Sequence, residues 1–178
     1  VLDIFRKKTA PAFEVALRLG ALYAGAEQHE EVEDVLKTYS EALGIAYQIR
    51  DDLSDIGASG ETNDLAGLRP SLLLAIAHDK AKDAQKELIG SVWRRTLPAG
   101  ATCAQIEQLY GELGADTRAR TLLETYKEEA IRSLAQQAMA QLELRRQLLE
   151  RDVLLGQLSE AKAAAEVARE RSDVLLRN

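Results

Sequence analysis

The sequence has 178 residues and a formal net charge of −6, which disfavours a general nucleic-acid-binding surface. A single cysteine, Cys103, excludes an internal disulfide and fits a reducing compartment. No apolar run approaches the roughly 20 residues that span a bilayer, so we expect a soluble, cytoplasmic protein. Because the chain opens on Val1 and its only methionine is Met139, we also expect further sequence upstream.

Abundant Ala, Leu, Glu and Arg favour helices throughout the chain, and so an all-α fold. A first helix is predicted to end near Lys8, because Pro11 has no backbone N–H and disrupts a continuing helix. The next helix begins around Pro11 and stops near Gly25. Lys8 and Thr9 then lie beside the unpaired N–H groups of a helix start, where anions bind. A solvated lysine and a capping threonine are the ordinary alternative.

A third helix is predicted to begin in the Glu-rich stretch 27–33 and to run to Asp55. Its last twelve residues read GIAYQIRDDLSD. At about 100° per residue, four oxygen-bearing side chains share one arc: Gln48, Asp51, Asp52 and Asp55. Gly44 falls on the same arc two turns earlier, which predicts open space above the acids.

Four apolar residues of this helix, Ile45, Ile49, Leu53 and Ile56, lie on the adjoining arc and are predicted to be buried. The three neighbouring carboxylates repel one another unless cations or water screen them. A hard, oxygen-seeking cation such as Mg²⁺, which often binds substrate phosphates as well, is the natural relief. The alternative is a solvated acidic face.

The rest of the chain continues the helical pattern. The stretch 57–70 is the one rich turn region and could form a mobile cover or a plain loop. A helix is predicted over 71–95, and Thr102 with Gln105 forms a capping-box pattern that opens a short helix ending at Gly114.

The last predicted helix runs from Thr117 to about Glu150 and is followed by a helical extension, so the expected organisation is 1–150 and 151–178. The extension could pack on the body, pair with another chain or protrude. Its irregular heptads favour packing or protrusion.

The stretch GIAYQIRDDLSD resembles the second aspartate-rich motif of the trans-isoprenyl diphosphate synthases, the polyprenyl synthetase family. Its pattern is a small residue, an aromatic residue followed by Gln, two further residues and then DDxxD. Lys8-Thr9 likewise resembles the Lys-Thr element of that family. The resemblance covers Val1 to about Glu150 and corresponds to the C-terminal half of a family member. It implies a helical bundle of the isoprenoid synthase type with a deep central cavity, usually as a homodimer.

The resemblance implies a prenyltransferase that joins an allylic diphosphate to isopentenyl diphosphate, giving a longer linear isoprenoid diphosphate. Asp51, Asp52 and Asp55 would hold Mg²⁺, and Lys8 and Asp51 would act in catalysis. Lys8, Thr9 and Gln48 would hold the substrate diphosphate. Arg69 is a further candidate there, in place of a family lysine, because a guanidinium binds phosphate in a fork geometry. The first Gly-Lys that follows the acids in the family is absent from this sequence.

The family also needs a first aspartate-rich motif, and this sequence contains no second DDxxD. We therefore expect that half to lie upstream or on another chain, and this chain to be inactive alone. Three other interpretations stay open: a noncatalytic subunit of a heteromeric prenyl synthase, a terpene cyclase of the same bundle architecture, and a structural helical protein.

Overall fold

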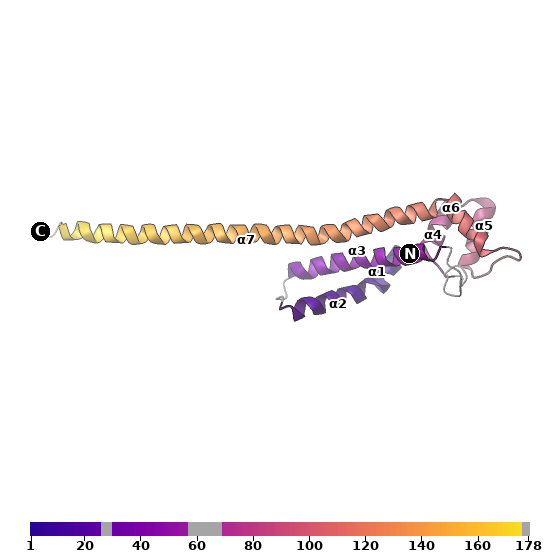
Figure 1. The fold of residues 1–178 in the computed structure, drawn as a ribbon, viewed down its shortest axis with the longest axis horizontal. Coiled ribbons are helices and arrows are strands. Elements are labelled where there is room, and N and C mark those ends of the chain that lie inside the picture. The colour runs from indigo at the N-terminus through magenta and orange to yellow at the C-terminus, as the bar shows by residue number, and fades with distance from the viewer. Residues whose placement is uncertain (26–29, 57–68, 176–178) are drawn as a thin grey trace. The chain divides into compact units, whose positions relative to one another are not determined.

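The computed structural model describes residues 1–25, 30–56 and 69–175, and this part of the chain forms helices without a strand (Figure 1). The predicted all-α class is confirmed. The helices are α1 (Leu2–Lys8), α2 (Ala10–Tyr23), α3 (Glu30–Ser54), α4 (Leu72–Lys80), α5 (Asp83–Trp93), α6 (Cys103–Glu112) and α7 (Ala115–Leu175). The chain divides into two compact units, Val1–Leu134 and Ala135–Asn178.

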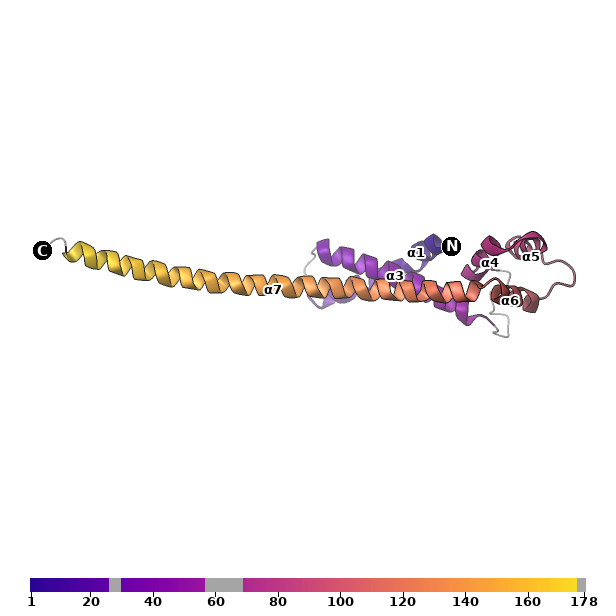
Figure 2. The same ribbon diagram turned by 90° about the horizontal axis from the view of Figure 1, so that it is seen from above.

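The first three helices form one end of the Val1–Leu134 unit, where α1 and α2 both pack along α3 (Figures 1 and 2). A single residue, Thr9, separates α1 from α2, and its N–H donates to the carbonyl of Phe5 at 2.9 Å. Pro11 stands in the first turn of α2. The predicted break near Lys8 is therefore confirmed, and Gly25, with φ of +78°, follows the end of α2 as expected.

The core of this unit lies against α3. Ile45 and Ile49 of α3 are 1% and 0% exposed, as predicted, and Leu53 packs partly buried on the same cluster. The cluster takes further buried side chains from the helices that follow: Leu72, Leu74, Ala77, Ile89, Ile106 and Tyr110. The prediction for Ile56 is wrong, because α3 ends at Ser54 and the helical spacing no longer applies; Ile56 is exposed.

Gly44 lies where α3 crosses the beginning of α2. A Cβ atom placed on Gly44 would stand 2.7 Å from Cα and 2.8 Å from N of Ala10, closer than side chains tolerate. The prediction of open space above the acids at Gly44 is therefore wrong. The missing side chain lets two backbones touch.

The helix predicted over 71–95 is in fact two helices. Ala81 and Lys82 adopt extended backbone, and Asp83 has φ of +46°. Ala81 is buried in the core, while Lys80 Nζ donates to the carbonyl of Leu113 at 2.9 Å. The end of α4 is thus bonded to the end of α6, and the chain turns at Ala81 and Lys82 instead of continuing as one helix.

The predicted capping box at the start of α6 is confirmed, with Thr102 and Gln105 bonding each other's backbone N–H groups. Gly114, with φ of +61°, ends this segment, and α7 begins at the next residue. Ala115 and Ala119 at the start of α7 are buried in the core of the first unit. None of the helices in the described ranges is long and apolar enough to cross a membrane. The expected turn region falls largely on 57–68, outside the described residues.

We expect Gly44→Ala to lower the free energy of unfolding by about 1–3 kcal/mol, because the new methyl group forces α2 and α3 apart. Gly20→Ala is the matched control, since Gly20 lies in α2 and a Cβ atom placed on it would meet no atom within 4 Å. That substitution should be neutral or stabilising by about 0.5–1 kcal/mol. Urea unfolding followed by fluorescence of the single Trp93 measures both, and equal stabilisation by the two substitutions would contradict the close approach.

Candidate functional site

The three aspartates at the end of α3 lie in different environments. Asp51 is exposed, Asp55 is half-buried, and Asp52 is only 4% exposed. The N–H of Asp55 donates to the carbonyl of Asp51 at 3.2 Å, so the helical turn is continuous between them. One turn therefore places Asp51 and Asp55 on the same side, as the sequence predicts.

A chain of hydrogen bonds joins the α1–α2 junction to the acidic end of α3. Thr9 Oγ1 lies 3.2 Å from Gln48 Oε1 and donates to it, and Gln48 Nε2 donates to Asp51 Oδ2 at 3.4 Å. The contact of Gly44 with Ala10 brings the two segments within this range. The structure thus brings together Thr9, Gln48 and Asp51, although 39 residues separate Thr9 from Gln48.

The two cationic candidates are placed less closely. Lys8 is the last residue of α1, beside Thr9, and its side chain is exposed. Arg69 is also exposed and lies two residues before Ser71, the N-cap of α4. Within the described residues, the hydrogen bonds of the Gln48 side chain go to Thr9 and Asp51, and Lys8 is not among its partners.

Asp52 is directed to the start of α4. The backbone N–H of Leu72 donates to Asp52 Oδ2 at 2.6 Å, and Ser71 Oγ accepts from the N–H of Leu74 at 3.2 Å. Two side-chain oxygens therefore satisfy backbone donors of the first turn of α4, where a negative charge also meets the favourable end of the helix dipole. The sequence carried a signal for this burial, because Asp52 lies at the edge of the acidic arc next to the apolar one.

Tyr110 of α6 completes this buried polar group and was not predicted from the sequence. Burial raises the pKa of Tyr110 above its ordinary value, a hydrogen bond with the Ser71 side chain opposes that rise, and the negative charges of Glu107 and Asp52 add to it. The phenol is therefore protonated at neutral pH. Only the apolar spacing of α6 indicated that Tyr110 would point inward.

The aromatic residue of the motif, Tyr47, lies on an exposed part of α3. The Arg50 guanidinium stands 5.0 Å from the centre of its ring, and the Phe13 ring of α2 is 5.8 Å away. Tyr47 thus lies between Phe13 of α2 and Arg50, the residue before Asp51. Its contact with Arg50 is a cation–π pair at an exposed site, which contributes about 0.5–1 kcal/mol.

The carboxylates at the end of α3 can supply part of the ligand shell of a hard cation, but not all of it. Among the described residues, no three His, Cys, Asp or Glu side chains gather closely enough to hold a metal ion. Mg²⁺, however, commonly binds one or two carboxylates and completes its shell with water and substrate phosphates. Asp51 is exposed and Asp55 half-buried, so solvent reaches both carboxylates, whereas Asp52 is buried and bonded to the N–H of Leu72.

Comparison with known proteins identifies the protein family to which the chain belongs. The polyprenyl synthetase family model matches residues 1–113, so the chain belongs to this family. It is 42% identical over 53 residues to the farnesyl diphosphate synthase of Escherichia coli K12, covering 30% of this chain and 17% of that protein. It is 38% identical over 55 residues to a short chain isoprenyl diphosphate synthase of Methanocaldococcus jannaschii, covering 31% and 16% of the two chains.

Solved structures of the same family share the fold. A polyprenyl synthase from Caulobacter crescentus, complexed with calcium and isoprenyl diphosphate, matches 76% of this chain with 27% identity and a TM-score of 0.64. A polyprenyl synthase from Roseobacter denitrificans matches 75% with 27% identity and a TM-score of 0.65. The chain spans 42% and 44% of these two proteins, respectively. The predicted family and its helical bundle are therefore confirmed.

The different surroundings of the aspartates predict different effects on stability. We expect Asp52→Ala to lower the free energy of unfolding by about 1–3 kcal/mol, because it leaves the buried N–H of Leu72 without its acceptor. Asp51→Ala should change it by less than about 0.5 kcal/mol, since the Asp51 side chain is exposed. Trp93 fluorescence during urea unfolding compares them, and an equal loss in both variants would contradict the assigned environments.

Proposed function

We propose that this chain provides the diphosphate-binding side of a prenyltransferase site, in which an allylic diphosphate loses diphosphate and is joined to isopentenyl diphosphate. The observation that carries the proposal is the hydrogen-bonded chain from Thr9 through Gln48 to Asp51. It links a hydroxyl, an amide and a carboxylate on two segments that also carry the two sequence elements of the family. A solvated acidic face needs no such link.

In this proposal Asp51 and Asp55 face the metal, and Asp52 keeps their helix in place. Asp52 binds the first turn of α4 through the N–H of Leu72, which fixes the end of α3 and with it the direction of both neighbouring carboxylates. Mg²⁺ held between these carboxylates and the substrate would neutralise the charge that grows on the departing diphosphate. Oxygen ligands in this number suit a metal shared with phosphates.

The remaining residues hold the diphosphate. The Thr9 hydroxyl and the Gln48 amide offer neutral hydrogen-bond donors, and Lys8 at the end of α1 adds a positive charge. Arg69 adds a second positive charge ahead of α4, where its planar guanidinium can bind two phosphate oxygens at once. Because Gln48 already bonds both Thr9 and Asp51, substrate binding would reorient a preformed group rather than assemble a new one.

The second acidic motif is proposed to come from outside residues 1–178, in the same polypeptide or on another chain. The sequence holds one DDxxD, and the match covers less than half of the solved polyprenyl synthases. On its own, the chain would bind a metal diphosphate without transferring a prenyl group. An assembly that supplies the second motif would complete the site.

Binding of inorganic diphosphate in the presence of Mg²⁺ tests the first half of the proposal. We expect Asp51→Ala to weaken binding by about tenfold or more, or about 1.4 kcal/mol, because it removes a carboxylate that faces the metal. Asp34→Ala is the control, since Asp34 is an exposed acid on the same helix, and it should bind like the unchanged chain. Titration calorimetry of the 178-residue chain measures both, and an equal loss in the two variants would contradict a specific site.

Incorporation of labelled isopentenyl diphosphate tests the second half. We expect none from the 178-residue chain alone, and a decrease by orders of magnitude when Asp51→Ala is introduced into the assembly that supplies the second motif. The reason is that the metal acts on charge that appears only as the C–O bond breaks. Unchanged turnover in that assembly would instead identify the chain as a noncatalytic subunit, and turnover by the chain alone would refute the need for a second motif.

A further inference from the structure

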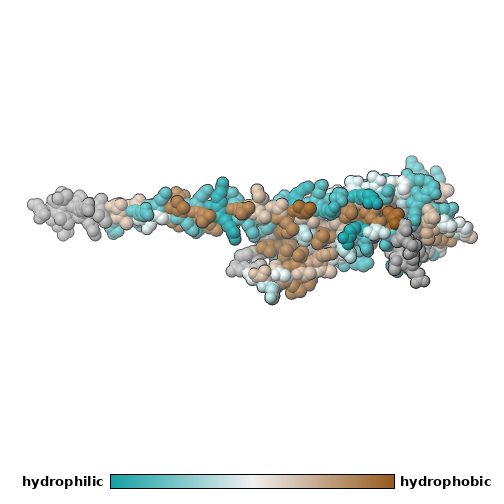
Figure 3. Space-filling model, in the orientation of Figure 1, coloured by the Kyte–Doolittle hydropathy of each residue, from teal (hydrophilic) through white to brown (hydrophobic). Residues whose placement is uncertain are grey.

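The second unit of the chain carries large aliphatic side chains that nothing in the described structure covers. Within it, α7 passes through residues 142–158 as an uninterrupted helix, and eight Leu or Val side chains there are 41–68% exposed. In the space-filling view, brown hydrophobic patches alternate with teal hydrophilic ones along α7 (Figure 3). Isolated helices are marginal in water, and packing of an apolar face supplies most of their stability. Exposed apolar side chains of this kind are typical of an interaction surface.

Four of these leucines form a regular seam. Leu144, Leu148, Leu155 and Leu158 are spaced as the a and d positions of two heptads, and Arg151 occupies the remaining core position between them. At about 100° per residue, all four lie within about 80° of one another. We name these four residues the leucine seam.

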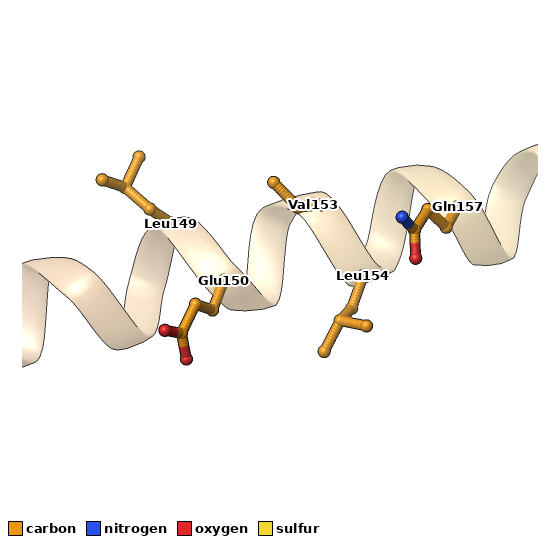
Figure 4. Close-up of a pocket in the computed structure, with 5 residues that line it drawn as sticks. All are labelled: Leu149, Glu150, Val153, Leu154 and Gln157. Atoms are coloured by element: carbon orange, nitrogen blue, oxygen red, sulfur yellow. The ribbon is translucent and has the colours of Figure 1, made fainter.

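A second group of apolar side chains lies on another side of α7 and is less regular. Figure 4 shows Leu149 and Val153 projecting from one side of the helix, and Glu150 and Leu154 from the other. On the helix, Val153 lies about 160° from Leu155. Leu142 lies one heptad before Leu149 on this side, but the core position between them is Arg146, and the positions after Val153 are Gly156 and Glu160. This side therefore has three aliphatic residues and ends at Val153, whereas the leucine seam continues to Leu158.

The charges of the second unit are balanced. Residues 135–178 contain seven Lys or Arg and seven Asp or Glu, so all of the net charge of −6 lies in residues 1–134. A helix that lies on a membrane surface is typically rich in Lys and Arg on its polar face, which this one is not. Two copies of a neutral helix, by contrast, meet without net repulsion, and each can supply both members of an ion pair.

Flanking charges select the direction in which two copies pair. A parallel pair in register places Arg151 against Arg151 of the other copy, and Arg145 against the uncharged Ala140. An antiparallel pair that sets Leu144 against Leu155 places each Arg151 against Leu148 of the other copy instead of against another Arg151. It also brings Arg145 of each copy beside Asp152 of the other, and symmetry repeats that pair. Arg145 makes no ion pair within the described residues, while Asp152 contacts only its neighbour Arg151, at 3.2 Å. Charge complementarity therefore favours the antiparallel arrangement.

We propose that α7 pairs antiparallel with α7 of a second copy of this chain through the leucine seam, with Arg145 and Asp152 as reciprocal ion pairs. This surface lies outside residues 1–113, which match the family model. It is therefore a contact additional to the proposed prenyltransferase site and does not rest on it.

Thiol labelling locates the interface residue by residue. In a Cys103→Ser background, Leu155→Cys places the only thiol in the leucine seam, and Val153→Cys places it on the other side of α7. The two positions are matched aliphatic residues, 54% and 61% exposed in the single chain. We expect maleimide to react at least about tenfold more slowly with Leu155→Cys when the chain concentration is raised through the micromolar range, and equally fast with Val153→Cys throughout.

Every other labelling pattern overturns the proposal. Protection of Leu155→Cys that does not change with concentration would mean that the seam packs on its own chain. Equal labelling of both positions at all concentrations would mean that the seam stays uncovered. Protection that requires added anionic vesicles would assign the seam to a lipid surface.

A charge exchange tests the antiparallel direction. Arg145→Glu alone and Asp152→Arg alone should each weaken association by about tenfold, because each places like charges opposite one another twice in the pair. The double variant Arg145→Glu, Asp152→Arg restores opposite charges and should recover association to within about threefold. Sedimentation velocity measures the dissociation constants, with circular dichroism to verify helix content. Failure of the double variant to recover while its helix content is kept would refute the antiparallel pair.

Discussion

The contact between Gly44 and Ala10 is the constraint on which the candidate site depends. Two helix backbones approach there more closely than any side chain on Gly44 would allow. Because Ala10 follows Thr9 directly, the same approach sets the Thr9 hydroxyl within 3.2 Å of Gln48. A larger residue at position 44 would move the α1–α2 junction away from α3 and break the link between hydroxyl, amide and carboxylate. Gly44 thus determines both the packing of α2 on α3 and the position of Thr9 beside Gln48.

The acidic end of α3 is held from the other side by the start of α4. Asp52 accepts the N–H of Leu72, Ser71 caps the same turn, and Tyr110 meets Ser71 from α6. A buried carboxylate is costly unless backbone donors stabilise it, and the first turn of α4 provides such a donor. Adjacent aspartates in one motif therefore lie in different surroundings: Asp52 fixes the backbone, and Asp51 and Asp55 are the carboxylates that we propose for the metal.

The sequence predicted most of the helices, since hydrophobic periodicity, proline and glycine signals act locally, and of the predicted site residues Thr9, Gln48 and Asp51 are joined by hydrogen bonds. The break after Lys80 and the contact of Tyr110 with Ser71 could not be predicted in this way, because both depend on where α6 lies relative to α4. Gly44 shows the same limit. Its position on the acidic arc was correct, but whether a glycine marks open space or a close contact depends on the backbone opposite. Ile56 was misplaced because the helix ended two residues earlier.

The two units of the chain differ in what stabilises them, and this difference bears on how the protein works. Residues 1–134 have a buried core of side chains from several helices, so their fold is determined within the chain. The leucines of residues 142–158 are exposed, and an exposed apolar surface of this kind is typical of an interaction site. The proposed pairing of α7 relies on association, and the proposed prenyltransferase site relies on it only where the second acidic motif is on another chain. Pairing of α7 would raise the effective concentration of the 1–134 unit of one copy near that of the other. It would therefore favour any contact that these two units can make with each other.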